Sequence, residues 1–167
     1  LDPVWSAQRV PYLICMLAAG CGLRHGEIIA LRPQDFRDGM VIVDRQYDKA
    51  GHTYKTPKWN SSRSVPVCEP IQSEVEMYVA DATIEDSALL FPSRSTDRPI
   101  EAHIVLEPLR DALEQIGIGR EAQTRDKRFL DLHSLRHTYV TRLRTSGVAD
   151  WELQAAAGHR SEIMTKN

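Results

Sequence analysis

The stretch that decides the fold lies near the carboxyl end of the chain and reads Leu132-His133-Ser134-Leu135-Arg136-His137-Thr138-Tyr139. Apolar residues recur at helical spacing through it and just beyond it, at Leu132, Leu135, Tyr139, Val140 and Leu143. This spacing predicts a helix whose apolar face lies in the core. His133 and Arg136 are three residues apart, so both are predicted to project from the opposite face. A guanidinium can bind two oxygens of a phosphate, and an adjacent imidazole can donate to a third or move a proton, so the pair predicts an anion site.

Two shorter motifs accompany this stretch, one on each side of it. Gly22-Leu23-Arg24, with Glu27 three residues after the arginine, lies upstream, and Gly158-His159 lies downstream. A basic hairpin is predicted between the upstream motif and the His133 helix. In this order and spacing the motifs resemble the catalytic domain of the tyrosine recombinase (phage integrase) family, over nearly the whole chain from about Pro11. The resemblance implies a site-specific DNA recombinase or integrase of a phage or other mobile element.

Periodicity along the chain predicts a mixed α+β domain that is mainly α-helical and carries a small three-stranded antiparallel sheet. Helical apolar spacing covers residues 6–19, 24–31, 69–80, 102–116 and 133–146, and Asp150 is placed to cap one more helix. The strands are predicted at 40–44, 52–56 and 63–67, as a meander joined by turn-forming residues. This combination agrees with the fold that the resemblance implies, that of the DNA breaking-rejoining enzymes.

A chain of 167 residues is expected to form one domain, 1–167, with a core of its own. Its first residue is not Met, so we expect a fragment or a processed chain. The resemblance implies that the amino-terminal core-binding domain and the carboxy-terminal tyrosine segment of the family are missing. The nucleophilic tyrosine is expected directly after Asn167, and none of the five tyrosines present is assigned that role. The fragment alone is therefore expected to be inactive.

The upstream motif carries the first candidate catalytic residues. Arg24 follows a glycine turn at the predicted start of a helix, and Glu27, one turn further, is suited to pairing with that or another guanidinium. From the residues alone, the alternative is a helix-start ion pair that contributes little. The resemblance implies that Arg24 and Arg136 bind the scissile phosphate with support from Glu27. It also implies phosphate contacts from His133 and His159, with His133 placed to help deprotonate the nucleophile.

The predicted hairpin supplies a candidate general acid. Lys55 leads its second turn and Arg63 stands opposite, so the hairpin tip is predicted to be basic. The resemblance implies that Lys55 protonates the leaving 5' oxygen, with Lys58 as the rival for that role. A lysine in an edge strand is otherwise an ordinary solubilising charge. Lys58, Arg63 and Arg128 are expected to contact the DNA backbone, although a plain surface loop remains the alternative around Arg128.

The charge pattern is consistent with a DNA-binding face, although the total charge is not. The net charge of −2 argues mildly against a nucleic-acid binder, because phosphate contacts supply most of the affinity of such proteins. Basic residues nevertheless gather between 120 and 144 and acidic ones between 69 and 85. This separation could give one basic face and one acidic face, and a merely solvated charged surface is the alternative.

Several other functional classes find little support in the sequence. No apolar run approaches the roughly 18 residues of a membrane span, and three unpaired cysteines are expected to be reduced thiols of a cytoplasmic bacterial protein. His133 and His137 are four apart, as zinc-binding histidines can be, but the H-E-x-x-H pattern is absent. We therefore expect no metal and no cofactor.

The resemblance also implies partners and leaves rivals open. Double-stranded DNA is the expected partner, with a homotetramer on DNA for the full-length protein and a monomer for this fragment. One rival is a DNA-binding or regulatory module that keeps the fold but transfers no strand. A second rival is a type IB topoisomerase-like enzyme that relaxes supercoils with the same residues.

Overall fold

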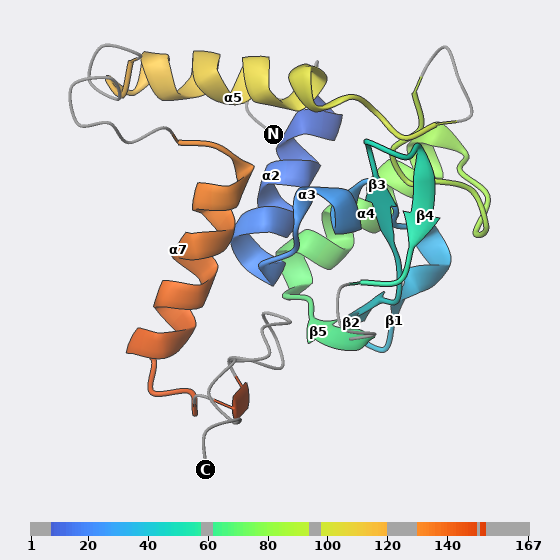
Figure 1. Ribbon diagram of the computed structural model, residues 1–167, viewed down its shortest axis with the longest axis horizontal. Coiled ribbons are helices and arrows are strands. Elements are labelled where there is room, and N and C mark those ends of the chain that lie inside the picture. The colour runs from blue at the N-terminus through green and yellow to red at the C-terminus, as the bar shows by residue number, and fades with distance from the viewer. Residues whose placement is uncertain (1–7, 58–61, 94–97, 120–129, 150, 153–167) are drawn as a thin grey trace.

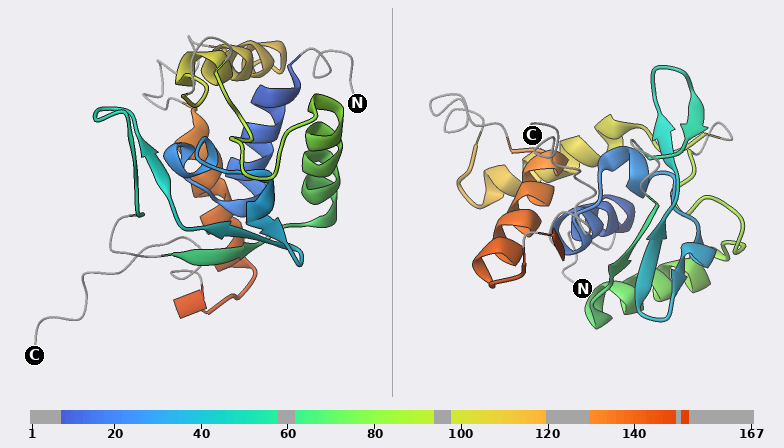
Figure 2. Two further views of the ribbon diagram at one scale, coloured as in Figure 1. Left: turned by 90° about the vertical axis from the view of Figure 1, so that its right-hand side faces the viewer. Right: turned by 60° about the horizontal axis from the view of Figure 1, so that its bottom comes forward.

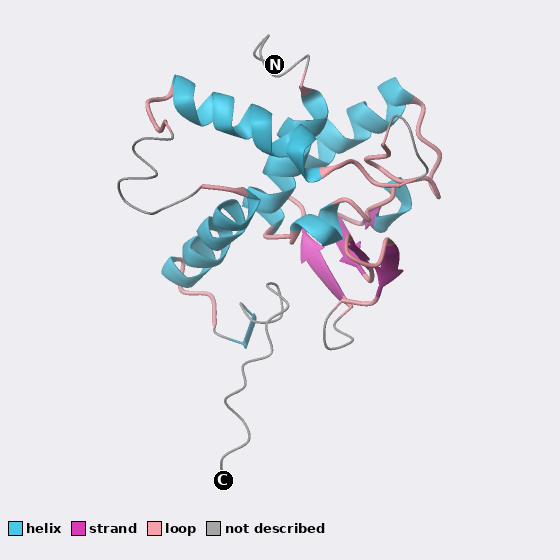
Figure 3. Cartoon of the chain, turned by 45° about the horizontal axis from the view of Figure 1, so that its top comes forward, coloured by secondary structure: helices cyan, strands magenta, loops and turns pink. Residues whose placement is uncertain are grey.

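The computed structural model describes residues 8–57, 62–93, 98–119, 130–149 and 151–152. Its strands gather on one side of the molecule and its helices form the remainder (Figure 3). The helices are α2 (Arg9–Cys21), α3 (His25–Ile28), the 3-10 helix η1 (Pro33–Asp35), α4 (Glu69–Ala82), α5 (Ala102–Gln115) and α7 (Leu132–Thr145). The strands are β1 (Phe36–Arg37), β2 (Met40–Val43), β3 (Gln46–Asp48), β4 (Thr53–Lys55) and β5 (Arg63–Pro66).

Helix α2 is the centre of the core. Its apolar residues recur at helical spacing, and α7, α5 and α4 all pack against it. In Figure 1, α5 crosses above α2 and α7 descends beside it. The fully buried side chains on α2 include Leu13, Ile14 and Leu17. Burying each such side chain contributes about 1.5–3 kcal/mol, so this helix fixes the positions of the others.

The strands form two antiparallel sheets. The larger has the order β1-β2-β5, and its inner face buries Val41 opposite Val65. The smaller is the β3–β4 hairpin, closed by a turn in which the Ala50 amide donates to the Asp48 carboxylate at 3.2 Å. The hairpin extends from the body of the molecule in both views of Figure 2.

The predicted fold class is confirmed, because the chain is mainly helical with a small antiparallel sheet. The predicted meander is wrong in its pairing. Residues 53–55 pair with β3, which we did not predict, and β2 pairs directly with β5. β3 reads Gln-Tyr-Asp and has no apolar alternation, which is why its sequence gave no strand signal.

The predicted helix after Asp150 lies almost entirely outside the described residues. Among the described residues, no helix combines the length and apolar character needed to cross a membrane.

Candidate active site

The site begins at the glycine turn between α2 and α3, which α7 contacts. Gly22 ends α2 in the left-handed region, with φ of 63°, which glycine adopts without steric cost. A Cβ at this position would collide with the ring of Tyr139, so the ring packs directly against the glycine backbone. The carbonyl oxygen of Gly22 accepts a hydrogen bond from Nη1 of Arg136. The end of α2 therefore positions both an aromatic ring and a guanidinium of α7.

Two residues later, Arg24 caps the short helix α3. Its backbone N–H donates to Oε2 of Glu27 at 2.8 Å, and its Nη1 donates to Oε1 at 2.9 Å. The Glu27 side chain is completely buried, whereas the Arg24 side chain is 31% exposed. Glu27 thus holds both the backbone and the guanidinium of Arg24, and the side chain stays partly exposed to solvent.

A third arginine reaches the same carboxylate from the sheet. Arg63 on β5 donates from Nη1 to Oε1 of Glu27 at 3.0 Å and from Nη2 to Oε2 at 2.7 Å. This two-bond geometry is the strongest that a guanidinium and a carboxylate can form. The expectation that Glu27 pairs with Arg24 or another guanidinium is confirmed, and it pairs with both.

Electrostatics explains why this buried carboxylate stays charged. Burial alone would raise the pKa of Glu27, but the hydrogen bonds and charges of Arg63 and Arg24 outweigh burial and lower the pKa. Burial lowers the pKa of Arg136 to about 10, with repulsion from Arg24 and Arg63 acting in the same direction and Glu27 opposing it. Arg136 therefore keeps its charge at neutral pH.

The charged side chains around Glu27 include more cations than anions. We call Arg24, Glu27, Arg63 and Arg136 the arginine cluster; it contains three guanidinium groups and one carboxylate. Charged groups so close in a partly dry site interact more strongly than they would in water. The cluster is therefore suited to binding an anion such as a phosphate.

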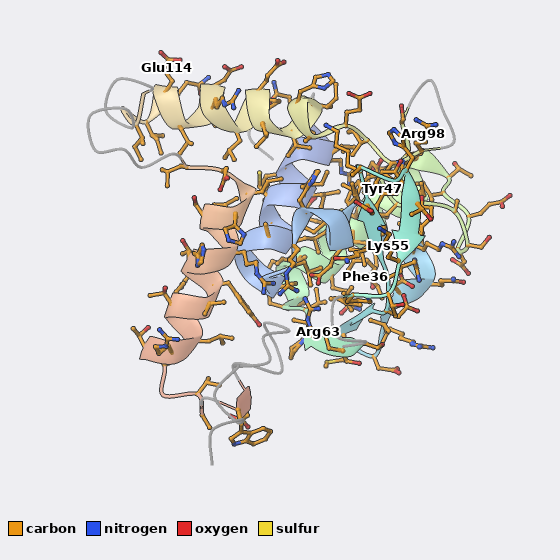
Figure 4. The ribbon with its side chains drawn as sticks, viewed as in Figure 1. Phe36, Tyr47, Lys55, Arg63, Arg98 and Glu114 are labelled. Atoms are coloured by element: carbon orange, nitrogen blue, oxygen red, sulfur yellow. The ribbon has the colours of Figure 1, made fainter. Side chains whose placement is uncertain are left out.

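Arg63 does not lie where the sequence placed it. We predicted it at an exposed basic tip opposite Lys55, but its side chain is only 7% exposed and belongs to the arginine cluster. Figure 4 shows Lys55 on β4 and Arg63 at the start of β5, so the two cations come from different sheets. The signal was present in the sequence. Arg63 precedes the buried Val65 by two residues, and such positions share one face of a strand.

The helix that carries His133 also differs from its prediction. Arg136 is buried on the side of Leu132, four residues earlier, whereas His133 is exposed. The two residues therefore do not project together from a face opposite the core. The ring of His133 instead meets that of His137 edge to face, with 4.4 Å between ring centroids. The prediction failed because a guanidinium with a carbonyl partner can replace an apolar residue on the buried side.

The remaining predicted residues lie outside the arginine cluster. Lys55 is 55% exposed on β4 and forms an ion pair with Asp48 across the hairpin. Lys58, Arg128 and His159 lie outside the described residues, as does Asn167.

We predicted Tyr139 on the apolar side of its helix, but not as part of the site. Its half-buried ring packs on Gly22, and burial raises the pKa of its hydroxyl, with a smaller contribution in the same direction from Cys21. The charges of Arg63 and Arg136 oppose that rise, which places the phenol beside the cluster. Tyr139 therefore forms one wall of the site.

Comparisons with known proteins point to one family. The model of the phage integrase family matches residues 6–167. Tyrosine recombinase XerA of Pyrococcus furiosus is 26% identical over 92% of this chain and 48% of its own length. A XerC-like tyrosine recombinase of Caldanaerobacter subterraneus is 26% identical over 91% of this chain and 43% of its own. The chain thus spans about half the length of the curated relatives it matches.

Solved structures share the fold. The Tn1549 transposon integrase, in complex with a circular intermediate DNA, superposes with a TM-score of 0.70 at 21% identity, over 96% of this chain and 53% of that one. A crystal structure of XerA recombinase gives a TM-score of 0.69 at 22% identity, over 95% and 51%. At these identities the likeness concerns the fold alone.

Proposed function

The chain belongs to the phage integrase family, and from that premise we propose that it is the catalytic domain of a site-specific DNA recombinase. The reaction is a metal-free transesterification of a phosphodiester through a 3'-phosphotyrosine intermediate. The observation that carries the proposal is the arginine cluster, in which Arg24, Arg63 and Arg136 meet around the buried Glu27.

The proposed mechanism assigns the phosphate to guanidinium groups. A phosphodiester resists attack because its negative oxygens repel nucleophiles, so an enzyme without a metal must neutralise them with fixed donors. Arg24 and Arg136 would bind the nonbridging oxygens. Arg63 would act through Glu27, by keeping that carboxylate ionised and aimed at Arg24. The cluster would therefore be ready for its substrate before DNA arrives.

Proton transfers complete the reaction. A tyrosine expected just past Asn167 would attack phosphorus, forming a bond to the 3'-phosphate as the bond to the 5' oxygen breaks. His133 would help to take the proton of the phenol, and His133 and His159 would hydrogen-bond the phosphate. Lys55 would give a proton to the leaving 5' oxygen. Because the phosphotyrosine conserves the bond energy, religation to another strand needs no ATP.

Duplex DNA is the proposed partner. The solved structure of the Tn1549 integrase is a complex with DNA. The guanidinium groups of the arginine cluster suit a phosphate backbone. We also propose that the full-length protein acts as a tetramer on DNA and that residues 1–167 form one catalytic domain. Lys58 and Arg128 remain proposed backbone contacts.

The test is covalent trapping. The chain, extended past Asn167 by its natural residues, is incubated with a nicked duplex that carries the element's junction and releases a short leaving strand. We expect a protein–DNA adduct that Arg136→Ala and Arg24→Ala both lower by about a hundredfold or more. Arg110→Ala, which removes an exposed arginine of α5, is the matched control.

Other outcomes would assign other functions. Duplex binding without any adduct would overturn the recombinase proposal in favour of a non-catalytic binding module. Relaxation of a supercoiled plasmid without sequence preference would favour the topoisomerase-like rival.

A further inference from the structure

A second candidate site lies beside α3 and is lined by other residues than those of the arginine cluster. It is a cavity of about 290 Å³ between α3, the β3–β4 hairpin and the segment that leads into α5. None of its described lining residues belongs to the arginine cluster or to the proposed catalytic set. The cavity is therefore chemically independent of the candidate active site, although Arg24 and His25 are neighbours in sequence.

Among the described residues of the cavity wall, cations outnumber acids. Lys49 comes from the hairpin turn and Arg98 from the segment before α5, while Glu101 is the single acidic residue of that set. Glu101 also contacts His103, with 3.3 Å between Oε2 and Nδ1. Arg98 and Tyr47 line the same cavity, and Figure 4 shows both on the side of the molecule that carries the hairpin. An anionic group is the ligand that this charge balance favours.

Two imidazoles also line the cavity. Burial lowers the pKa of His25 and the charge of Lys49 adds to that effect, so His25 is neutral at pH 7. Its Nε2 is buried and meets no hydrogen-bond partner among the described residues. A buried polar atom without a partner is unusual in a folded protein and is expected to be satisfied by a ligand or water. His52 is held nearby by the Tyr47 hydroxyl, 3.2 Å from its Nδ1.

The rest of the wall is apolar or aromatic. The apolar lining consists of Ile29, Pro99, Ile100 and Ala102, and Tyr47 adds an aromatic ring. A bare phosphate would leave this surface uncovered. The volume lies at the lower limit of about 300 Å³ for ligand pockets, so a single small ligand fits and a dinucleotide does not.

We propose that this cavity binds one mononucleotide unit, with the phosphate between Lys49 and Arg98 and the base against Tyr47 and the apolar wall. Base stacking on an aromatic ring tolerates any base, and a neutral imidazole can hydrogen-bond a base edge. The unit could be a free nucleotide or an unpaired nucleotide of a DNA strand, since both present the same chemistry. Only the second source rests on the proposed function.

Binding here would also act on the hairpin. Lys49 and Tyr47 belong to the same hairpin as Lys55, whereas His25 and Arg98 belong to the body of the molecule. A ligand that touches both sides would hold the hairpin against α3. The site therefore offers a way to control where Lys55 lies.

The test measures binding of thymidine 5'-monophosphate by isothermal titration, with inorganic phosphate as a second probe. We expect the mononucleotide to bind and Lys49→Gln and Arg98→Gln each to weaken it about tenfold or more. Ala102→Phe, which fills the cavity without changing charge, should abolish binding. Lys49→Gln should weaken mononucleotide binding to the same degree in a chain that also carries Arg136→Ala, which separates this site from the proposed active site. Arg110→Gln is the control for an exposed arginine.

Three outcomes of the titration would overturn the proposal. Equal affinity for phosphate and mononucleotide, or binding that survives Ala102→Phe in a folded variant, would overturn the proposal. So would the absence of mononucleotide binding to the unaltered chain. A duplex with one unpaired nucleotide, compared with a fully paired duplex, identifies the source. Tighter binding of the former that is lost in Lys49→Gln assigns the site to DNA, and binding of the free nucleotide alone assigns it to a soluble ligand.

Discussion

The arginine cluster and the β3–β4 hairpin both carry charged residues of the proposed reaction, but the first is buried and the second is exposed. In the cluster, Glu27 is fully buried, Arg63 is 7% exposed, and every described ion pair converges on one carboxylate. In the hairpin, all three residues of β4 are exposed, and Lys55 is paired with Asp48 across the hairpin. The arginine cluster is fixed in the folded interior, whereas Lys55 is held at the surface by a solvent-exposed ion pair.

This difference matches what the two regions are proposed to do. Groups that stabilise a transition state are most effective when their orientation is set before the substrate binds. A proton donor must instead exchange its resting partner for the leaving oxygen. An exposed ion pair contributes little free energy, so Lys55 can leave Asp48 at small cost. The hairpin is therefore the adjustable part of the proposed active site.

The largest expected effect tests the hairpin. Lys55→Met should lower the rate of strand cleavage by about 10²–10⁴-fold, because the 5' oxygen loses its acid, while the free energy of unfolding stays the same. Single-turnover cleavage and urea unfolding measure the two quantities. A bridging 5' sulfur is a good leaving group without protonation, so a substrate that carries it should restore the rate.

Lys58→Met is the matched control for Lys55→Met. If Lys58→Met shows the larger loss and the sulfur substrate rescues it, Lys58 is the acid and the role assigned to Lys55 is wrong.

The next effect tests the arginine cluster. Glu27→Gln should lower the free energy of unfolding by about 3–5 kcal/mol, because it removes the charge that Arg24 and Arg63 share in a buried place. Urea unfolding measures the change. The matched change in the hairpin, Asp48→Asn, should leave the urea midpoint where it is. Similar losses from both substitutions would remove the contrast between the regions.

A glycine substitution separates backbone strain from collision. Gly22→Ala should cost about 2–4 kcal/mol, because alanine is strained at φ of 63° and its Cβ would displace the Tyr139 ring. Gly117→Ala has the same backbone problem at φ of 83°, with nothing within 4 Å of its Cβ, so it should cost only about 1–2 kcal/mol. Thermal unfolding compares the two, and equal costs would mean that the packing at Gly22 contributes nothing.

The smallest expected effect is a pH dependence. Since the pKa of Glu27 is lower in the folded state than its ordinary value of 4.5, its charge stabilises the fold fully above pH 4.5. That stability is lost as the pH falls from 4.5 through the lowered folded pKa, because the unfolded chain takes up the proton first. Urea unfolding between pH 6 and 3 should show a steeper loss for the unaltered chain than for Glu27→Gln. Parallel curves would contradict the assignment.

Local sequence patterns predicted the helices well, because each depends on apolar spacing that needs only neighbouring residues. The predicted helix 102–116 and the observed Ala102–Gln115 differ by one residue. Arg24 and Glu27 were paired correctly for the same reason, since three residues separate them. Contacts between distant residues were harder to predict. The hydrogen bond from Arg136 to Gly22 joins residues 114 positions apart, and no local sequence pattern predicts it.

Two errors share one physical cause, that charged residues were assigned to the surface. Arg63 and Arg136 were both placed facing outward, yet each is buried with a partner that satisfies its guanidinium. Burying a charge is costly only when it is unpaired. Strand alternation would have placed Arg63 inside, and the four-residue spacing from Leu132 would have done the same for Arg136.

Arg136 donates to a main-chain oxygen, and this limits which substitutions can remove the bond. Every amino acid carries that oxygen, so no codon change at position 22 can delete it. Only the torsion that directs it can be lost, and glycine is the residue that holds that torsion without penalty. The orientation of the Arg136 guanidinium thus depends on position 22 having no side chain.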